Sequence, residues 1–378
     1  MKRCLLTLCV LLLLPSCALG EELSAAIGAT LDTLDLSPLL SFLGKLFPDE
    51  AHLRAWLLQL ASGQEMIGTE ALLSRAADML ASTLKSTLRS MALLFLPAVL
   101  LGVMERMESL FSSRSFHLAQ TGCCLSLCAM MAKDLAAHLV LCENTVLRMA
   151  DAMQALFPLL LTLLTAVGGT AGASLYQPAL TAAGGTMITF VRTFTLKLAL
   201  GYGAVTLLDT LGDRLRLASL AALLRRGAAW TLGIAFTLFL SVTALQGVTS
   251  AVRDGVSIRA AKYAVDHFVP VVGGMFADTM DALIGSALLV KNALGLTGLA
   301  ILVLVSLFPL VQTLCASFAY RACAALLEIL SPGRLCRCIG SFASVLTLFF
   351  VIQLSVGAMF FLLTAQLLAA GNLIVMLR

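Results

Sequence analysis

Long apolar runs constrain this chain more than any other feature. A helix needs about 20 apolar residues to cross a hydrocarbon core of about 30 Å, and four such runs carry no charged residue: Met153–Ser174, Ala228–Gln246, Leu296–Phe318 and Ser341–Ala369. Only 12% of all residues are charged, against about 25% in soluble domains. The alternating segments of about 10 residues that a transmembrane barrel requires are not found. The sequence therefore predicts an all-α, polytopic helical membrane protein with broken or re-entrant helices.

Charge and cysteine content argue against two other classes. The net charge of +4 is spread over short loops, and no dense Lys/Arg tract indicates nucleic-acid binding. The 11 cysteines lie in the leader, on an apolar helix and near a basic loop, where cysteine acts as a small apolar residue. Cys336 and Cys338 lack further His or Cys at zinc spacing. We therefore expect no metal site and no cofactor.

The first 20 residues are typical of a secretory signal peptide. Two basic residues precede an apolar run, Cys4–Leu14, that is too short to cross a bilayer. Small residues at Ala18 and Gly20 predict cleavage after Gly20. A lipoprotein signal that uses Cys17 and an uncleaved anchor are the alternatives. Cleavage would place the next residues outside the cytoplasm.

Two further regions follow the signal peptide. Residues 21–86 carry ordinary soluble chemistry and apolar residues at helical spacing, which predicts an extracytoplasmic region of amphipathic helices. Residues 87–378 form the membrane domain, with six to eight spans that begin at 88–104.

Within the membrane domain, an apolar run from Phe116 to Cys142 is followed by a polar break at Glu143–Asp151. Asp134 and His138 are four residues apart on one face of that run. They could form a proton relay, or the neighbouring Lys133 could mark an interfacial end of the helix.

Proline and glycine predict helix breaks at two places: Pro158, Gly168 and Gly169, and then Pro270, Gly273 and Gly274. Freed backbone groups in lipid must find partners inside protein or line a water-filled cavity. The two sets weakly resemble each other, as the paired broken helices of transporters do. Ala179–Leu208, also glycine-rich, is either one long tilted helix or two short re-entrant pieces.

The arginine-rich segment Asp209–Arg226 exposes a conflict in the topology. Its arginines place it in the cytoplasm. Counting one crossing per apolar run from an outside start places it outside. The conflict disappears if one run within 118–208 does not cross, or if 179–208 crosses twice.

A stripe of charged and polar residues follows the span at 228–246. Apolar residues alternate there with charges at helical spacing, and these polar residues form the candidate site: Arg253, Asp254, Arg259, Lys262, Asp266, Asp278, Asp281 and Asn292. A charge in lipid costs several kcal/mol unless it is paired or hydrated. The stripe therefore either pairs internally and fixes helix register, or lines a conduit or subunit contact.

No catalytic motif accompanies these charges. A phosphate-binding glycine loop followed by Lys-Ser/Thr and a His-Glu-x-x-His sequence are both missing. Asp278 and Asp281 lie three apart on one helix, whereas an intramembrane aspartyl protease needs two facing carboxylates. We therefore expect no enzyme, and we assign no catalytic residue.

Two blocks of the sequence resemble a known family. The first is MQALFPLLLTLLTAVGGTAGASLYQP at Met153–Pro178, and the second runs from Ser241 to Gly298 with Val256-Ser257-Ile258-Arg259, Pro270-Val271-Val272-Gly273-Gly274 and Leu289-Val290-Lys291-Asn292. In these blocks, and in its layout of leader, short extracytoplasmic part and multiple spans, the chain resembles the stage III sporulation protein AE family of endospore-forming bacteria.

The resemblance implies a function and partners. Members of this family lie in the mother-cell membrane around the engulfed forespore. With the other stage III sporulation A proteins, a separate ATPase and a forespore-side partner, they are thought to form a secretion-like channel that sustains late forespore gene expression. The resemblance thus implies a non-enzymatic membrane subunit. A self-sufficient secondary transporter is the alternative, supported by the broken helices, and an intramembrane hydrolase has only the Asp pair in its favour.

Overall fold

The computed structural model describes residues 95–104, 114–211, 217–268, 273–330 and 334–376, with isolated positions before residue 95. The predicted signal peptide, its cleavage after Gly20, nearly all of residues 21–86 and the break at Pro270 lie outside the described residues. For 247–268 and 273–283 the structure describes the backbone and not the side chains.

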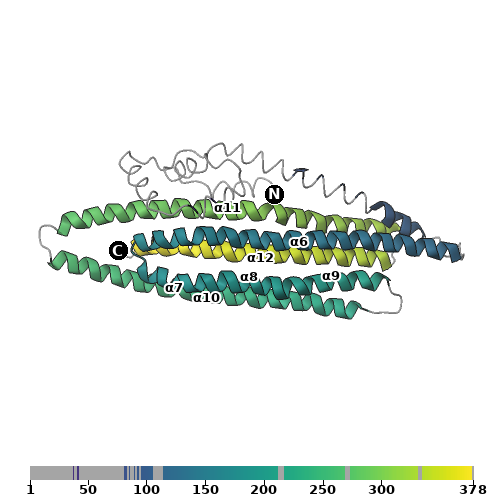
Figure 1. Cartoon of the computed structure of the whole chain (residues 1–378), viewed down its shortest axis with the longest axis horizontal. Coiled ribbons are helices and arrows are strands. Elements are labelled where there is room, and N and C mark those ends of the chain that lie inside the picture. The colour runs from purple at the N-terminus through teal and green to yellow at the C-terminus, as the bar shows by residue number, and fades with distance from the viewer. Residues whose placement is uncertain are drawn as a thin grey trace.

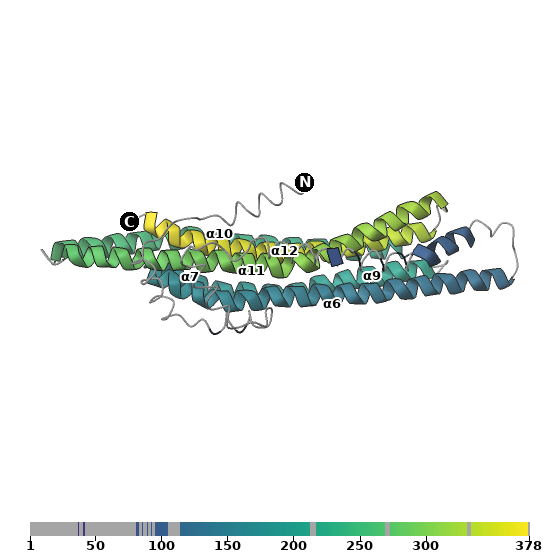
Figure 2. The ribbon, with the colours of Figure 1, turned by 90° about the horizontal axis from the view of Figure 1, so that it is seen from above.

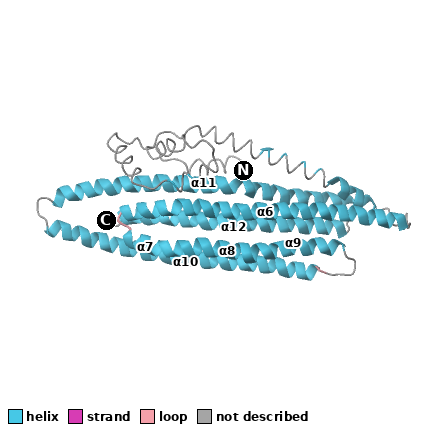
Figure 3. Cartoon of the chain, viewed as in Figure 1, coloured by secondary structure: helices cyan, strands magenta, loops and turns pink. Residues whose placement is uncertain are grey.

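Within these ranges every long element is a helix and no strand occurs (Figure 3). The elements are α6 (Arg114–Ala166), α7 (Thr170–Thr181), the π-helix η1 (Ala182–Thr186), α8 (Met187–Phe190), the π-helix η2 (Val191–Thr195), α9 (Leu196–Leu211), α10 (Ala218–Phe268), α11 (Gly273–Leu330) and α12 (Arg334–Met376). They form an elongated bundle whose helices run nearly parallel to its long axis (Figure 1).

The C-terminal helix α12 is the centre of the bundle. It packs most extensively on α11 and also contacts α6, α9 and α10. In Figures 1 and 2 it lies between its neighbours along most of its length. Phe342, Phe349 and Ile352 are fully buried, which places the core along this helix.

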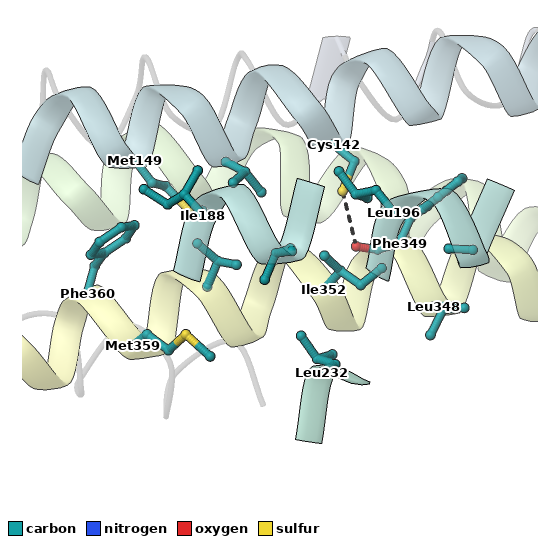
Figure 4. Close-up of a cluster of buried hydrophobic side chains, with 14 of the residues drawn as sticks. Cys142, Met149, Ile188, Leu196, Leu232, Leu348, Phe349, Ile352, Met359 and Phe360 are labelled. Atoms are coloured by element: carbon teal, nitrogen blue, oxygen red, sulfur yellow. Dashed lines mark hydrogen bonds between the residues drawn. The ribbon is translucent and has the colours of Figure 1, made fainter. Parts of the chain in front are cut away.

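Figure 4 shows side chains from several helices packed together in the core of the bundle. Cys142 and Met149 from α6 and Ile188 from α8 meet Phe349 and Ile352 of α12. The Cys142 thiol donates a weak hydrogen bond to the Phe349 carbonyl oxygen, with a sulfur–oxygen distance of 3.8 Å. Cysteine here fills a small space between helices, as the sequence predicts, and none of the described cysteines forms a disulfide.

The outer surface is apolar. Trp230, Leu245 and Ile329 are more than two-thirds exposed. Four helices within the described ranges are long and apolar enough to cross a membrane: Leu118–Ala166, Ala218–Gln246, Ile284–Ile329 and Cys336–Asn372. Since an exposed apolar surface of this extent belongs in lipid rather than water, the chain is a polytopic helical membrane protein, as predicted.

The predicted polar break at Glu143–Asp151 is instead helical, because α6 continues through it. An α-helix satisfies its own backbone hydrogen bonds, so a few polar side chains do not end it. α11 is likewise one continuous helix, from Gly273 to Leu330. The predicted number of spans stays untested, but the runs on either side of the polar break share one helix.

The end of α6 lies at a glycine and not at its proline. The predicted break at Pro158 is wrong, because α6 runs through that residue; the proline removes only one backbone donor, and packing on both sides holds the neighbouring turns. α6 ends instead at Ala166, where Gly168 has φ 98°, a conformation that favours glycine. Gly273 and Gly274 are the first two residues of α11.

The stretch 179–208 is one interrupted helix and does not reverse. Two π-helical segments, 182–186 and 191–195, are inserted between α7, α8 and α9, and the three helices follow one another alongside α10 in Figure 1. Gly184 and Gly185 lie in the first π segment, where their low helix propensity favours irregular winding. The single long helix is therefore the correct alternative.

Candidate functional site

Most of the predicted stripe lies on a hairpin that leaves the bundle. Arg253, Asp254, Arg259, Lys262 and Asp266 are on the last part of α10, and Asp278 and Asp281 are on the first part of α11. Figures 1 and 2 show these two helix ends extending past the end of α12. We call residues 253–281 the α10–α11 hairpin. Its backbone groups these charges together at one end of the molecule, although its side chains are not described.

Asn292 is separated from the rest of the stripe. It follows Asp281 by 11 residues on α11, which is about 16 Å along a helix that rises 1.5 Å per residue. It therefore lies in the bundle, where its Oδ1 atom is buried without a hydrogen-bond partner. Asn292, predicted as part of the stripe, is therefore not part of the hairpin.

Lys291, next to Asn292, is the one charged residue that is fully buried in the described part of the chain. Its exposed fraction is 0%, and its Nζ donates to the Leu368 carbonyl oxygen of α12 at 3.2 Å. No ion pair with a described carboxylate accompanies that contact. An ionisable side chain inside a membrane protein marks a functional site by default.

Glycines create the space around Lys291. A Cβ added at Gly371 of α12 would overlap the Lys291 ammonium, and one added at Gly295 of α11 would overlap Leu368. Slightly further along α11, a Cβ at Gly298 would lie 2.7 Å from Leu156 of α6. Small residues allow membrane helices to approach closely, so Lys291–Gly298 is one place where α11 packs tightly against α6 and α12.

Sequence reasoning missed Lys291, although a signal was present. It is the one charged residue between Asp281 and Arg321. A lone lysine in so long an apolar stretch is costly in lipid, and this cost is the signal that could have identified it.

Asp134 meets a partner on another helix. The Tyr320 hydroxyl of α11 donates to Asp134 Oδ2 of α6. His138, the other member of the predicted relay, has a buried Nδ1 with no hydrogen bond. The structure thus joins Asp134 to Tyr320 and shows no hydrogen bond from Asp134 to His138.

A second charged contact joins α6 to the interrupted helix. Arg192 of η2 donates to Glu143 Oε1 through Nη2 at 2.6 Å and Nε at 3.1 Å, and the two side chains are 39% and 40% exposed. Glu143 begins the stretch that was predicted to be a polar break. The ion pair instead links the middle of α6 to the π turn that carries Arg192.

Smaller polar contacts connect α11 to α12. Ser317 and Thr347 share a hydrogen bond of 2.7 Å, and Gln353 donates to Thr313 at 3.4 Å. No group of three or more His, Cys, Asp or Glu residues in the described ranges could hold a metal ion. These polar groups join helices, and in the described part they form no arrangement of nucleophile, base and orienting group.

Comparison with known proteins identifies the family. The family model for stage III sporulation protein AE matches residues 51–371, which includes all helices described above except the last residues of α12. The chain belongs to the stage III sporulation protein AE family. The resemblance predicted from the two sequence blocks is thereby confirmed.

A curated member of the family is similar over part of its length. The stage III sporulation protein AE of Bacillus subtilis (strain 168) is 33% identical over 230 residues, which cover 61% of this chain and 58% of that protein. The chain therefore matches less than two thirds of that relative. No solved structure matches the chain. Lys291, the hairpin and the Arg192–Glu143 pair all lie within the range matched by the stage III sporulation protein AE model.

Proposed function

We propose that the protein is a non-enzymatic membrane subunit of a secretion-like channel complex that connects mother cell and forespore during endospore formation. In this role it is needed for late forespore gene expression. The observation that carries the proposal is the family match over residues 51–371. Four helices suited to crossing a membrane support a multi-pass location, which we assign to the mother-cell membrane around the forespore.

The continuous helix α6 supports one orientation. The sequence conflict arose from counting two crossings within 116–174, and α6 contains most of that range in one helix. With an outside start and a crossing at 88–104, one crossing by α6 and one by α7–α9 place residues 212–217 in the cytoplasm. That placement satisfies the positive-inside rule for Arg225 and Arg226.

The same orientation assigns a role to the hairpin. If α10 crosses once more, the α10–α11 hairpin projects on the side facing the forespore. Its dense charges suit a contact with partner proteins, since complementary charges give such contacts specificity. We assign this contact to the forespore-side partner and to other stage III sporulation A proteins, while a separate ATPase supplies energy.

A deletion of the coding sequence tests the function. Engulfment should proceed while transcription from late forespore promoters falls, and the full-length chain supplied in trans should restore it. A strain that keeps full late forespore transcription without this protein would contradict the proposal. Co-purification from sporulating cells should also recover other stage III sporulation A proteins.

A self-sufficient secondary transporter is the second candidate. Two observations favour it: the buried Lys291 and the helix α7–α9 interrupted by π segments, since π turns are frequent at functional sites. Ion-coupled solute uptake by the purified protein alone in liposomes would support the transporter. If uptake needs the partner proteins, the channel subunit is favoured.

A further inference from the structure

A polar cavity of about 480 Å³ lies between α9, α10 and α12, near the loop that joins α9 to α10. Its polar lining consists of Tyr202, Thr206, Asp209, Arg225, Arg226 and Ser341. These groups contribute neither to the helix contacts around Lys291 nor to the α10–α11 hairpin.

Alanines of α10 keep this cavity open. Ala218, Ala222 and Ala229 line it together with Arg225, and residues at this spacing share one face of a helix. Apart from the arginines, α10 lines the cavity with alanine methyl groups alone, which leaves room beside the two guanidinium groups.

The cavity is suited to an anion. Arg225 and Arg226 are both exposed on α10, and within the described part of the chain neither forms an ion pair. Asp209 opposes them, but one of its oxygens accepts the Leu217 N–H at 2.9 Å, which ties it to the start of α10. Two guanidinium groups against one carboxylate leave a surplus positive charge, and guanidinium groups bind phosphate through paired N–H donors.

The surroundings of the cavity indicate a lipid. Arg226 lies near the start of the candidate span Ala218–Gln246. On the same face of α10, Leu223 is 66% exposed and Trp230 is 72% exposed. Tryptophan is enriched where a membrane protein meets the headgroup region, and basic pockets between membrane helices bind anionic headgroups.

We propose that this cavity binds the phosphate of an anionic phospholipid headgroup, with Arg225 and Arg226 as its ligands and the acyl chains lying against Trp230. The inference does not depend on the function proposed above, because it concerns lipid binding by the isolated chain. A zwitterionic lipid binds less well, because its ammonium group adds to the surplus positive charge.

Native mass spectrometry of the full chain in detergent tests the proposal, with phosphatidylglycerol and phosphatidylethanolamine as the lipid probes. Wild-type protein should retain phosphatidylglycerol in preference to phosphatidylethanolamine. The double variant Arg225→Gln, Arg226→Gln should bind phosphatidylglycerol about tenfold more weakly, as expected for the loss of charge-assisted hydrogen bonds. The matched control Arg148→Gln, Arg321→Gln removes the same charge from exposed sites outside the cavity and should bind as wild type does.

A second variant keeps the test decisive if the arginine variant fails to fold. Ala222→Leu fills the cavity without changing any charge and should also lower phosphatidylglycerol binding. Equal phosphatidylglycerol binding by wild type, Ala222→Leu and any folded arginine variant would overturn the proposal, as would equal binding of the two lipids by wild type. If inorganic phosphate binds to this site and phosphatidylglycerol does not, the lipid assignment is overturned and a soluble phosphate ligand replaces it.

Discussion

The bundle and the α10–α11 hairpin hold their charges in different ways. In the bundle, two charged side chains contact a neighbouring helix: Lys291 donates to the Leu368 carbonyl, and Asp134 accepts from Tyr320. In the hairpin, seven of the eight stripe residues follow one another on helix ends that extend past α12. Because an unpaired charge in lipid costs several kcal/mol, these two side chains are held by polar atoms of the neighbouring helices. We propose that the hairpin's charges serve contacts outside the chain.

The largest expected effect comes from filling the space beside Lys291. Gly371→Leu should lower the free energy of unfolding by about 3 kcal/mol, because overpacking a tight contact forces side chains and backbone to shift. Thermal unfolding in detergent measures the change. The control is Gly233→Leu, where a new side chain meets open space, and it should unfold as wild type does. Equal stability of the two variants would show that α11 and α12 do not meet as described.

The next effect tests the link between α6 and α11. Tyr320→Phe should lower the free energy of unfolding by about 1–3 kcal/mol, because it leaves the half-buried Asp134 carboxyl without its donor. The same substitution in an Asp134→Ala background should cost much less, since no acceptor remains. A double-mutant cycle in detergent gives the coupling energy between the two residues. A coupling energy near zero would mean that the Tyr320–Asp134 contact does not join α6 to α11.

Neutralising the buried Lys291 should raise the free energy of unfolding rather than lower it. Lys291→Met keeps a similar length and removes the charge, so it should raise the free energy of unfolding by about 1 kcal/mol. Lys291→Ala should instead lower it, because the space of the stem is left empty. If Lys291→Met proves strongly destabilising, the ammonium has an ionic partner that the described residues do not include.

Substitutions in the α10–α11 hairpin should have the smallest effect on stability. Arg259→Glu with Lys262→Glu should change the free energy of unfolding by no more than about 0.5 kcal/mol, because this part of α10 extends past the end of α12 (Figure 1) and surface substitutions have small effects. It should nevertheless reduce co-purification of partner proteins from sporulating cells. Arg148→Glu with Arg321→Glu, on exposed sites of the bundle, is the matched control. Strong destabilisation by the hairpin variant, with partner binding intact, would reverse the roles assigned to the two regions.

Local properties of the chain were predictable. Long uncharged runs predict membrane helices, because lipid solvates only apolar side chains and a backbone whose hydrogen bonds are satisfied within the helix. Gly168 marks the end of α6 because the turn there needs positive φ. The helical alternation of charges also placed seven stripe residues on two helices, although not on a hairpin that leaves the bundle.

Properties that depend on neighbouring helices were not predictable in the same way. Pro158 lies within α6, and the polar stretch that begins at Glu143 is helical, with Arg192 of a distant segment paired to Glu143. The lone charge of Lys291 was visible in the sequence, but its partner, a carbonyl 77 residues away, was not. In the same way, Arg225 and Arg226 predicted only sidedness until α9 and α12 enclosed a cavity around them.

The sequence by itself therefore determined the class of protein, the family and the chemical character of each segment, since these depend on composition and on local backbone preference. Only the tertiary structure decided which polar groups are paired, which are exposed and which helices are continuous. The physical reason is that the free energy of a charge near lipid depends on the partner atoms within hydrogen-bond distance. Those atoms come from helices far away along the chain.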